Sequence, residues 1–203
     1  MARKDFDFKP DPSGTGILSK LYLTPRQRQT GLKWLLFALV CVVALVIQDS
    51  LFSRVTLFGG WLDLAPALIV LICIVQGPVS GSVFALAGSL IYVFSGSAPG
   101  TYAIAFITVY ASLAAAFRQS YLRRSFSSAW LCAAVAMMLY ELSVFAMGMF
   151  WGLTYLSRIR VFAMTGGLSI LVMPLVYPLL GWIGKIGGET WKEYPDSARW
   201  FCC

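Results

Sequence analysis

The chain contains no histidine, and charged residues make up only 12% of its 203 residues. Without histidine, the commonest general base and metal ligand are missing. The five cysteines show neither metal-site spacing nor a disulfide framework. There is also no phosphate-binding loop, serine-nucleophile motif or pair of carboxylates. We therefore predict a protein that is not an enzyme and that holds no cofactor or metal.

Apolar sequence is abundant instead: 59% of the residues are hydrophobic, in six runs. The runs are Leu32–Leu51, Leu62–Val75, Val79–Phe94, Tyr102–Phe117, Ala129–Met149 and Val161–Ile183. A transmembrane helix needs about 20 mostly apolar residues, with a range of about 17–25. The first, fifth and sixth runs meet this length. The second, third and fourth approach it when flanking residues are added, although the second run can also be re-entrant.

The predicted fold class is all-α, a polytopic membrane protein with a bundle of six transmembrane helices. We expect this domain at residues 32–183, between a basic N-terminal tail at 1–31 and a C-terminal tail at 184–203. Little sequence remains for a separate soluble domain.

The basic residues predict the orientation, because lysine and arginine are enriched in cytoplasmic loops. With six spans, 13 of the 16 basic residues fall on the side of the two tails, including the loop around Arg118. Only Arg54, Arg158 and Arg160 fall on the other side. Both termini are therefore predicted to be cytoplasmic. The net charge of +7 then reflects the cytoplasmic face and not a nucleic-acid partner.

Glu141 is the only one of nine acidic residues in the middle of an apolar run. Charge inside a bilayer is costly and usually functional. Its carboxyl group must therefore face protein or a wet cavity, or carry a proton. Two interpretations remain open: a binding or proton-handling site, or a carboxyl that orients the fifth span by a hydrogen bond to a neighbouring helix.

Small residues recur every four positions in the third run. Two series of four-residue spacing are present: Gly77, Gly81, Ala85 and Ser89 on one helical face, and Gly88, Tyr92 and Gly96 on another. Such spacing lets helix backbones approach closely in lipid, so it predicts a well-packed span. In the sixth run, Pro174 and Pro178 are expected to bend the helix.

Two motifs in the middle of the chain suggest a family. The second run is entered through Asp63-Leu64-Ala65-Pro66, and Gly88, Tyr92, Gly96 and Gly100 then recur at four-residue spacing before Ala103-Ile104-Ala105. The stretch from Asp63 to Phe106 resembles the rod shape-determining protein MreD family, with its acidic-to-proline entry and its Gly-x-x-x-Asp-x-x-x-Gly-x-x-x-Gly signature. Glu141 also matches an acidic position of that family. Tyr92 stands where the family has aspartate.

The resemblance implies a non-enzymatic scaffold in the cell-elongation machinery of rod-shaped bacteria, located in the cell membrane. Such proteins are thought to bind the bitopic protein MreC and, through it, the MreB filament and the peptidoglycan polymerase and transpeptidase. Helix packing and partner contacts are then expected from Gly81, Gly88, Tyr92, Gly96, Gly100 and Glu141. Asp63 and Pro66 form the membrane entry motif. The resemblance leaves open whether the chain also forms a homo-oligomer.

A second interpretation is the substrate-binding S-component of an energy-coupling-factor vitamin transporter, another small six-span protein. The outer loops offer Trp61, Trp151, Tyr155, Arg158 and Arg160, which can stack on and neutralise an anionic ligand. The same aromatics are typical of the membrane interface. Few other polar groups are expected to converge near this rim. A third interpretation, an ion or proton channel, rests on Glu141 alone.

Overall fold

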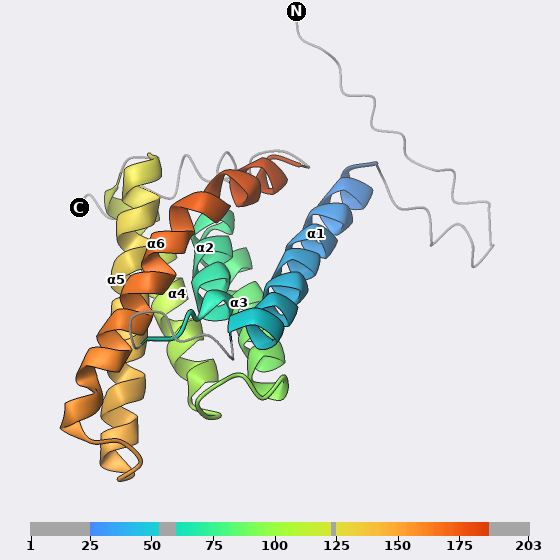
Figure 1. Ribbon diagram of the computed structural model, residues 1–203. Coiled ribbons are helices and arrows are strands. Elements are labelled where there is room, and N and C mark those ends of the chain that lie inside the picture. The colour runs from blue at the N-terminus through green and yellow to red at the C-terminus, as the bar shows by residue number, and fades with distance from the viewer. Residues whose placement is uncertain (1–24, 53–59, 123–124, 187–203) are drawn as a thin grey trace, which may run out of the picture.

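The computed structural model describes residues 25–52, 60–122 and 125–186, and the elements within these ranges are helical (Figure 1). The predicted all-α fold class is confirmed for this part of the chain. The elements are α1 (Pro25–Ile47), the π-helical turn η2 (Gln48–Phe52), α2 (Leu64–Gln76), α3 (Pro78–Phe94), α4 (Ala103–Tyr121), α5 (Phe126–Phe150), the 3-10 turn η3 (Leu156–Arg158) and α6 (Ile159–Gly184).

Among the residues that the structure describes, four helical segments are long and apolar enough to cross a membrane, which supports a membrane protein. They are Gln27–Ser50, Ala103–Tyr121, Phe126–Phe150 and Leu156–Gly184. The fourth apolar run thus reaches a spanning length of 19 residues, as expected. The second does not, because α2 has only 13 residues. A helix of that length measures about 20 Å, against a hydrocarbon core about 30 Å thick.

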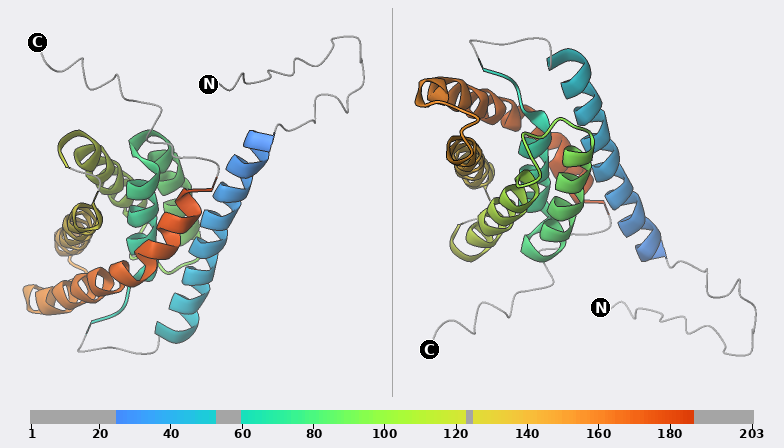
Figure 2. Two further views of the ribbon diagram at one scale, coloured as in Figure 1. Left: turned by 90° about the horizontal axis from the view of Figure 1, so that it is seen from above. Right: turned by 90° about the horizontal axis from the view of Figure 1, so that it is seen from below.

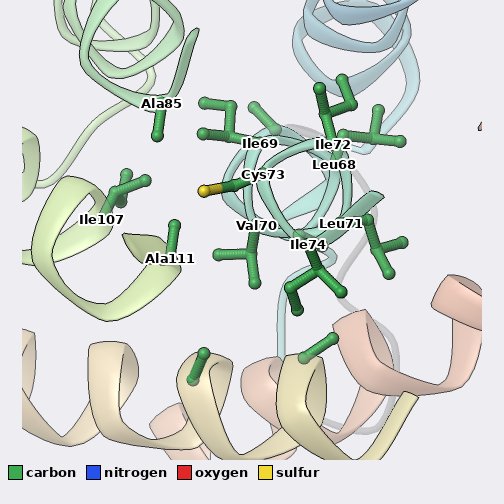
Figure 3. Packing of buried hydrophobic residues seen from close by; sticks show 14 of the residues in the cluster. Leu68, Ile69, Val70, Leu71, Ile72, Cys73, Ile74, Ala85, Ile107 and Ala111 are labelled. Carbon is green, nitrogen blue, oxygen red and sulfur yellow. The ribbon is translucent and has the colours of Figure 1, made fainter. Parts of the chain in front are cut away.

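The short helix α2 lies at the centre of the bundle. Twelve of its 13 residues are buried, and it contacts α1, α3, α4, α5 and α6. Figures 1 and 2 show the longer helices arranged around it. In Figure 3, Ile69 and Cys73 point toward Ala85 of α3 and Ile107 of α4, while other α2 side chains fill the remaining sides. A helix that is apolar all round fits this central position.

The two ends of the bundle carry different parts of the chain (Figure 1). One end, here called the terminal end, holds the start of α1, the end of α6, the connection between α2 and α3, the end of α4 and the start of α5. The opposite end holds the α3–α4 loop and the connection from α5 to α6. Helix α1 begins at Pro25, inside the segment predicted as a tail. Helix α6 runs through Pro174 and Pro178 without interruption.

The packing glycines of the third run are used inside the bundle. A Cβ atom built on Gly81 would lie 2.6 Å from the carbonyl oxygen of Cys73 in α2. One built on Gly88 would lie 3.1 Å from Cγ1 of Ile69, also in α2. The small-residue series thus allows α3 to approach α2 closely. This face is covered by α2, so it is not available to a partner protein.

The series ends where α3 ends. Gly96 and Gly100 follow the last α3 residue, Phe94, so their four-residue spacing does not place them on a helix face. Gly96 has a φ of +79°, a left-handed conformation that suits glycine in a turn. Gly100 lies against the ring of Tyr102. Their predicted role in helix packing is therefore corrected to a role in the α3–α4 loop.

The prediction that Arg118 lies in the loop between the fourth and fifth spans is wrong. The residue lies in the last turn of α4 and is only 4% exposed. Its Nη1 donates to the carbonyl oxygen of Ile74 near the end of α2 (3.2 Å), and its Nη2 to that of Ser125 (3.4 Å). The Ile74 carbonyl would normally bond the N–H of residue 78, which is proline and has none. Arg118 thus supplies a hydrogen-bond donor to a carbonyl group at the C-terminal end of the central helix, where the backbone offers none.

Candidate functional site

A cavity of about 650 Å³ lies among the helix ends that face away from the terminal end of the bundle. Its lining comes from η2, the segment before α2, the end of α3 and the loop that follows, α5 and the loop after it, η3, and the first turns of α6. These elements are far apart in the sequence, so only the packing of helices around α2 creates the cavity. We treat it as the candidate functional site.

Asp63 connects the elements around the cavity. Its Oδ1 accepts a hydrogen bond from Nε2 of Gln48 (2.7 Å), and its Oδ2 accepts one from the hydroxyl of Tyr92 (2.8 Å). Its backbone N–H donates to Oγ of Ser169 in α6 (3.2 Å). The residue therefore ties η2, α3 and α6 to the start of α2. A carboxylate at a helix N-terminus is also favoured by the helix dipole.

The Asp63 side chain does not cap α2 with a hydrogen bond. Another side chain accepts a hydrogen bond from the backbone at the start of this helix. Oε1 of Gln48 accepts a hydrogen bond from the N–H of Ala65 (2.9 Å), one of the first-turn donors that lack a helical partner. Pro66 in the same turn has no N–H to satisfy. In the segment before α2, the N–H of Trp61 donates to Oγ1 of Thr165 (3.1 Å). A short helix can thus begin inside the bundle without unsatisfied donors at these positions.

Glu141 lies on α5 and lines the same cavity. The residue is 6% exposed, and its Oε1 has no hydrogen-bond partner within the described residues. A Cβ atom built on Gly166 of α6 would lie 3.3 Å from Cγ of Glu141, so α6 packs closely against this side chain. The interpretation that a neighbouring helix holds the carboxyl by a hydrogen bond therefore fails for this oxygen.

The predicted site residues divide into two groups. Asp63, Tyr92, Gly96 and Glu141 all line the cavity. The others lie elsewhere: Gly81 and Gly88 at the α2–α3 contact, Gly100 in the α3–α4 loop and Pro66 in the buried first turn of α2.

Sequence reasoning missed Gln48, Thr165 and Ser169, which bond the segment at the start of α2. The sequence feature that could have identified these three residues is a polar side chain at the end of an apolar run or within one. Of the outer-loop residues proposed for an anionic ligand, Trp61 and Arg158 line the cavity. Trp151, Tyr155 and Arg160 do not belong to its lining. The expectation that few polar groups converge here was wrong.

Tyr92→Phe is expected to lower the free energy of unfolding by about 1.5–3 kcal/mol, because it removes a hydrogen bond to a charged group. Thermal unfolding of the purified protein in detergent measures this loss. Tyr121→Phe is the matched control, because the Tyr121 ring is 77% exposed. Equal unfolding temperatures for the two variants would show that the bond between Tyr92 and Asp63 contributes little.

Comparison with protein-family models, with curated proteins and with solved structures finds no match to this chain. The resemblance to the MreD family therefore rests on the motif residues alone, and the function follows as a proposal from the cavity and the surface.

Proposed function

We propose that the chain is a non-enzymatic integral membrane scaffold of the bacterial cell-elongation complex, which binds an MreC-like bitopic partner in the cell membrane. In this proposal the chain crosses the membrane six times, with both termini in the cytoplasm. The short α2, enclosed by the other helices, is then only the buried part of the second crossing. The gathering of the start of α1 and the end of α6 at one end of the bundle supports this topology (Figure 1). The distribution of lysine and arginine supports the same orientation.

The observation that carries the proposal is an apolar groove of about 460 Å³ between α4 and α5. Small side chains contribute to it, including Ala114, Cys132 and Ala136. Larger apolar side chains also line it, such as Phe117 and Leu131, and these are 54% and 55% exposed. The groove thus belongs to the lipid-facing surface of a membrane protein, and it combines small residues with exposed apolar ones.

A single transmembrane helix is the partner that suits such a groove. In lipid, helices associate through close packing, and small residues allow their backbones to approach. The two helices that form the groove are held together by a hydrogen bond between the Tyr110 and Ser143 hydroxyl groups (2.6 Å). A bitopic protein presents one apolar helix, which matches this shape. Contacts to a peptidoglycan polymerase and transpeptidase would then be made through that partner.

Affinity purification of the tagged protein from its native membrane tests the proposal, with co-purifying proteins identified by mass spectrometry. We expect MreC-like and cell-wall synthesis proteins with the wild-type chain, and their loss with Ala114→Phe, which fills the groove. Leu175→Phe is the control, because Leu175 is 80% exposed on α6 and lies outside the groove. Absence of these partners, or their full recovery with Ala114→Phe, would contradict the scaffold proposal.

A second candidate function is favoured by the cavity, which offers the convergent polar groups that a solute-binding subunit needs. This candidate is the S-component of an energy-coupling-factor vitamin transporter. The same purification separates the two functions. Recovery of paired ATPases together with a small coupling subunit would support the transporter and not the scaffold.

A further inference from the structure

We propose that the cavity lined by Asp63, Tyr92 and Glu141 binds a small organic cation, and that Glu141 receives its ammonium or guanidinium group. This inference concerns a ligand site and does not depend on the partner that the groove binds. It also reverses the charge of the ligand that the outer-loop arginines suggested.

The first argument is that the two buried acids are in different situations. Both carboxyl oxygens of Asp63 accept hydrogen bonds, from Gln48 and Tyr92, and the start of α2 lies beside them. Asp63 therefore uses both of its carboxyl oxygens in hydrogen bonds that join elements of the fold. Glu141 has an oxygen without a partner in the described residues, although the residue is only 6% exposed. It is the acid whose hydrogen-bonding capacity the described residues leave partly unused, and it lines the cavity.

The second argument is the charge of the lining. Asp49, Asp63 and Glu141 contribute three acidic groups, and Arg158 is the one basic residue among the described lining residues. Arg158 is an exposed residue of η3, at the start of α6, and no ion pair joins it to Glu141 in the described part of the chain. Gly166 of α6, which packs against the Glu141 side chain, brings no positive charge.

A buried carboxylate is costly unless a cation or hydrogen-bond donors compensate it. A ligand with an ammonium or guanidinium group supplies both the charge and the donors. An anionic ligand would instead meet a lining with three carboxyl groups, in which Arg158 is the one basic residue among the described residues. The electrostatic balance of the lining thus selects the sign of the ligand.

The third argument is the size and the apolar part of the lining. A volume of about 650 Å³ falls within the range of about 300–1,000 Å³ that small-molecule sites occupy. Trp61, Tyr92, Tyr140 and Phe162 contribute aromatic rings to the lining. Aromatic faces attract cations and pack against flat apolar groups. The expected ligand therefore combines a cationic head with an aromatic or aliphatic body.

The experiment is calorimetric titration of the purified full chain in nanodiscs, with empty nanodiscs as the background. The probes are tyramine and agmatine as cations and 4-hydroxyphenylacetate as an anion of similar size to tyramine. We expect at least one cation to bind and the anion to give no signal. Glu141→Gln keeps the shape and removes the charge, so it is expected to weaken cation binding about tenfold or more. Asp49→Asn makes the same acid-to-amide change elsewhere in the lining and is expected to weaken cation binding less than Glu141→Gln does.

A second measurement uses the wild-type chain and so does not depend on the folding of a variant. A hydrophobic carbodiimide should label Glu141, and a bound cation should slow this labelling, as detected by peptide mass spectrometry. The proposal is overturned if neither cation binds, if the anion binds equally well, or if Glu141→Gln binds as tightly as the wild type. An equal loss in Asp49→Asn also overturns it, because Glu141 would then have no special role. These assays contain no partner protein, so their failure leaves the co-purification test of the scaffold unaffected.

Discussion

Gly81→Leu is expected to prevent formation of a stable bundle. The added Cβ atom would lie 2.6 Å from the carbonyl oxygen and 2.8 Å from Cα of Cys73, which are backbone atoms of α2 and cannot rotate away. Overpacking of a core costs about 1–3 kcal/mol and occasionally more, and here the helix that must move is the centre of the fold. The yield of monodisperse protein in detergent and its unfolding temperature measure the effect.

Two other glycines make the comparison specific. Gly88→Leu is expected to cost less, because the nearest atoms belong to the Ile69 side chain, which can change its rotamer. Gly167→Leu on α6 is expected to be nearly neutral, since no atom lies within 4 Å of a Cβ built there. If all three leucine variants gave the same yield and unfolding temperature, close approach of α3 to α2 would not be what these glycines provide.

Arg118→Met is expected to lower the free energy of unfolding by about 2–3 kcal/mol, because it removes charged donors from buried carbonyl groups. The Ile74 carbonyl would lose its hydrogen bond where Pro78 supplies none, and the Ser125 carbonyl would lose one at the start of α5. Thermal or chemical unfolding of the purified protein in detergent checks this value. The effect is expected to be centred on the junction of α2, α4 and α5.

Arg28→Met is the matched control for this experiment, because Arg28 is exposed on α1. The same side-chain replacement should leave its unfolding temperature close to that of the wild type. Equal destabilisation by the two methionine variants would show that loss of charge alone is responsible. In that case Arg118 would not stabilise the end of α2 through its hydrogen bonds.

The site was partly predictable from the sequence. Asp63, Tyr92 and Glu141 were singled out, through motif spacing or through a charge inside an apolar run, and the structure brings all three to one cavity. Their meeting was not predictable, because each lies in a different apolar run and no local pattern relates them. Gln48 was missed for the same reason, since its two hydrogen bonds join it to residues after the next connection in the chain.

The sequence by itself indicated the all-α fold class that the described residues adopt and helices long and apolar enough to cross a membrane, because long apolar runs with few charges leave little other possibility for the backbone in lipid. It also indicated where the helices lie. Tertiary structure alone decided that α2 is the central helix and that Arg118 is buried against its end. The physical reason is that lipid and protein interiors are similarly apolar, so hydropathy does not distinguish a lipid-facing helix from one enclosed by others. Polar residues are placed by the packing of distant segments.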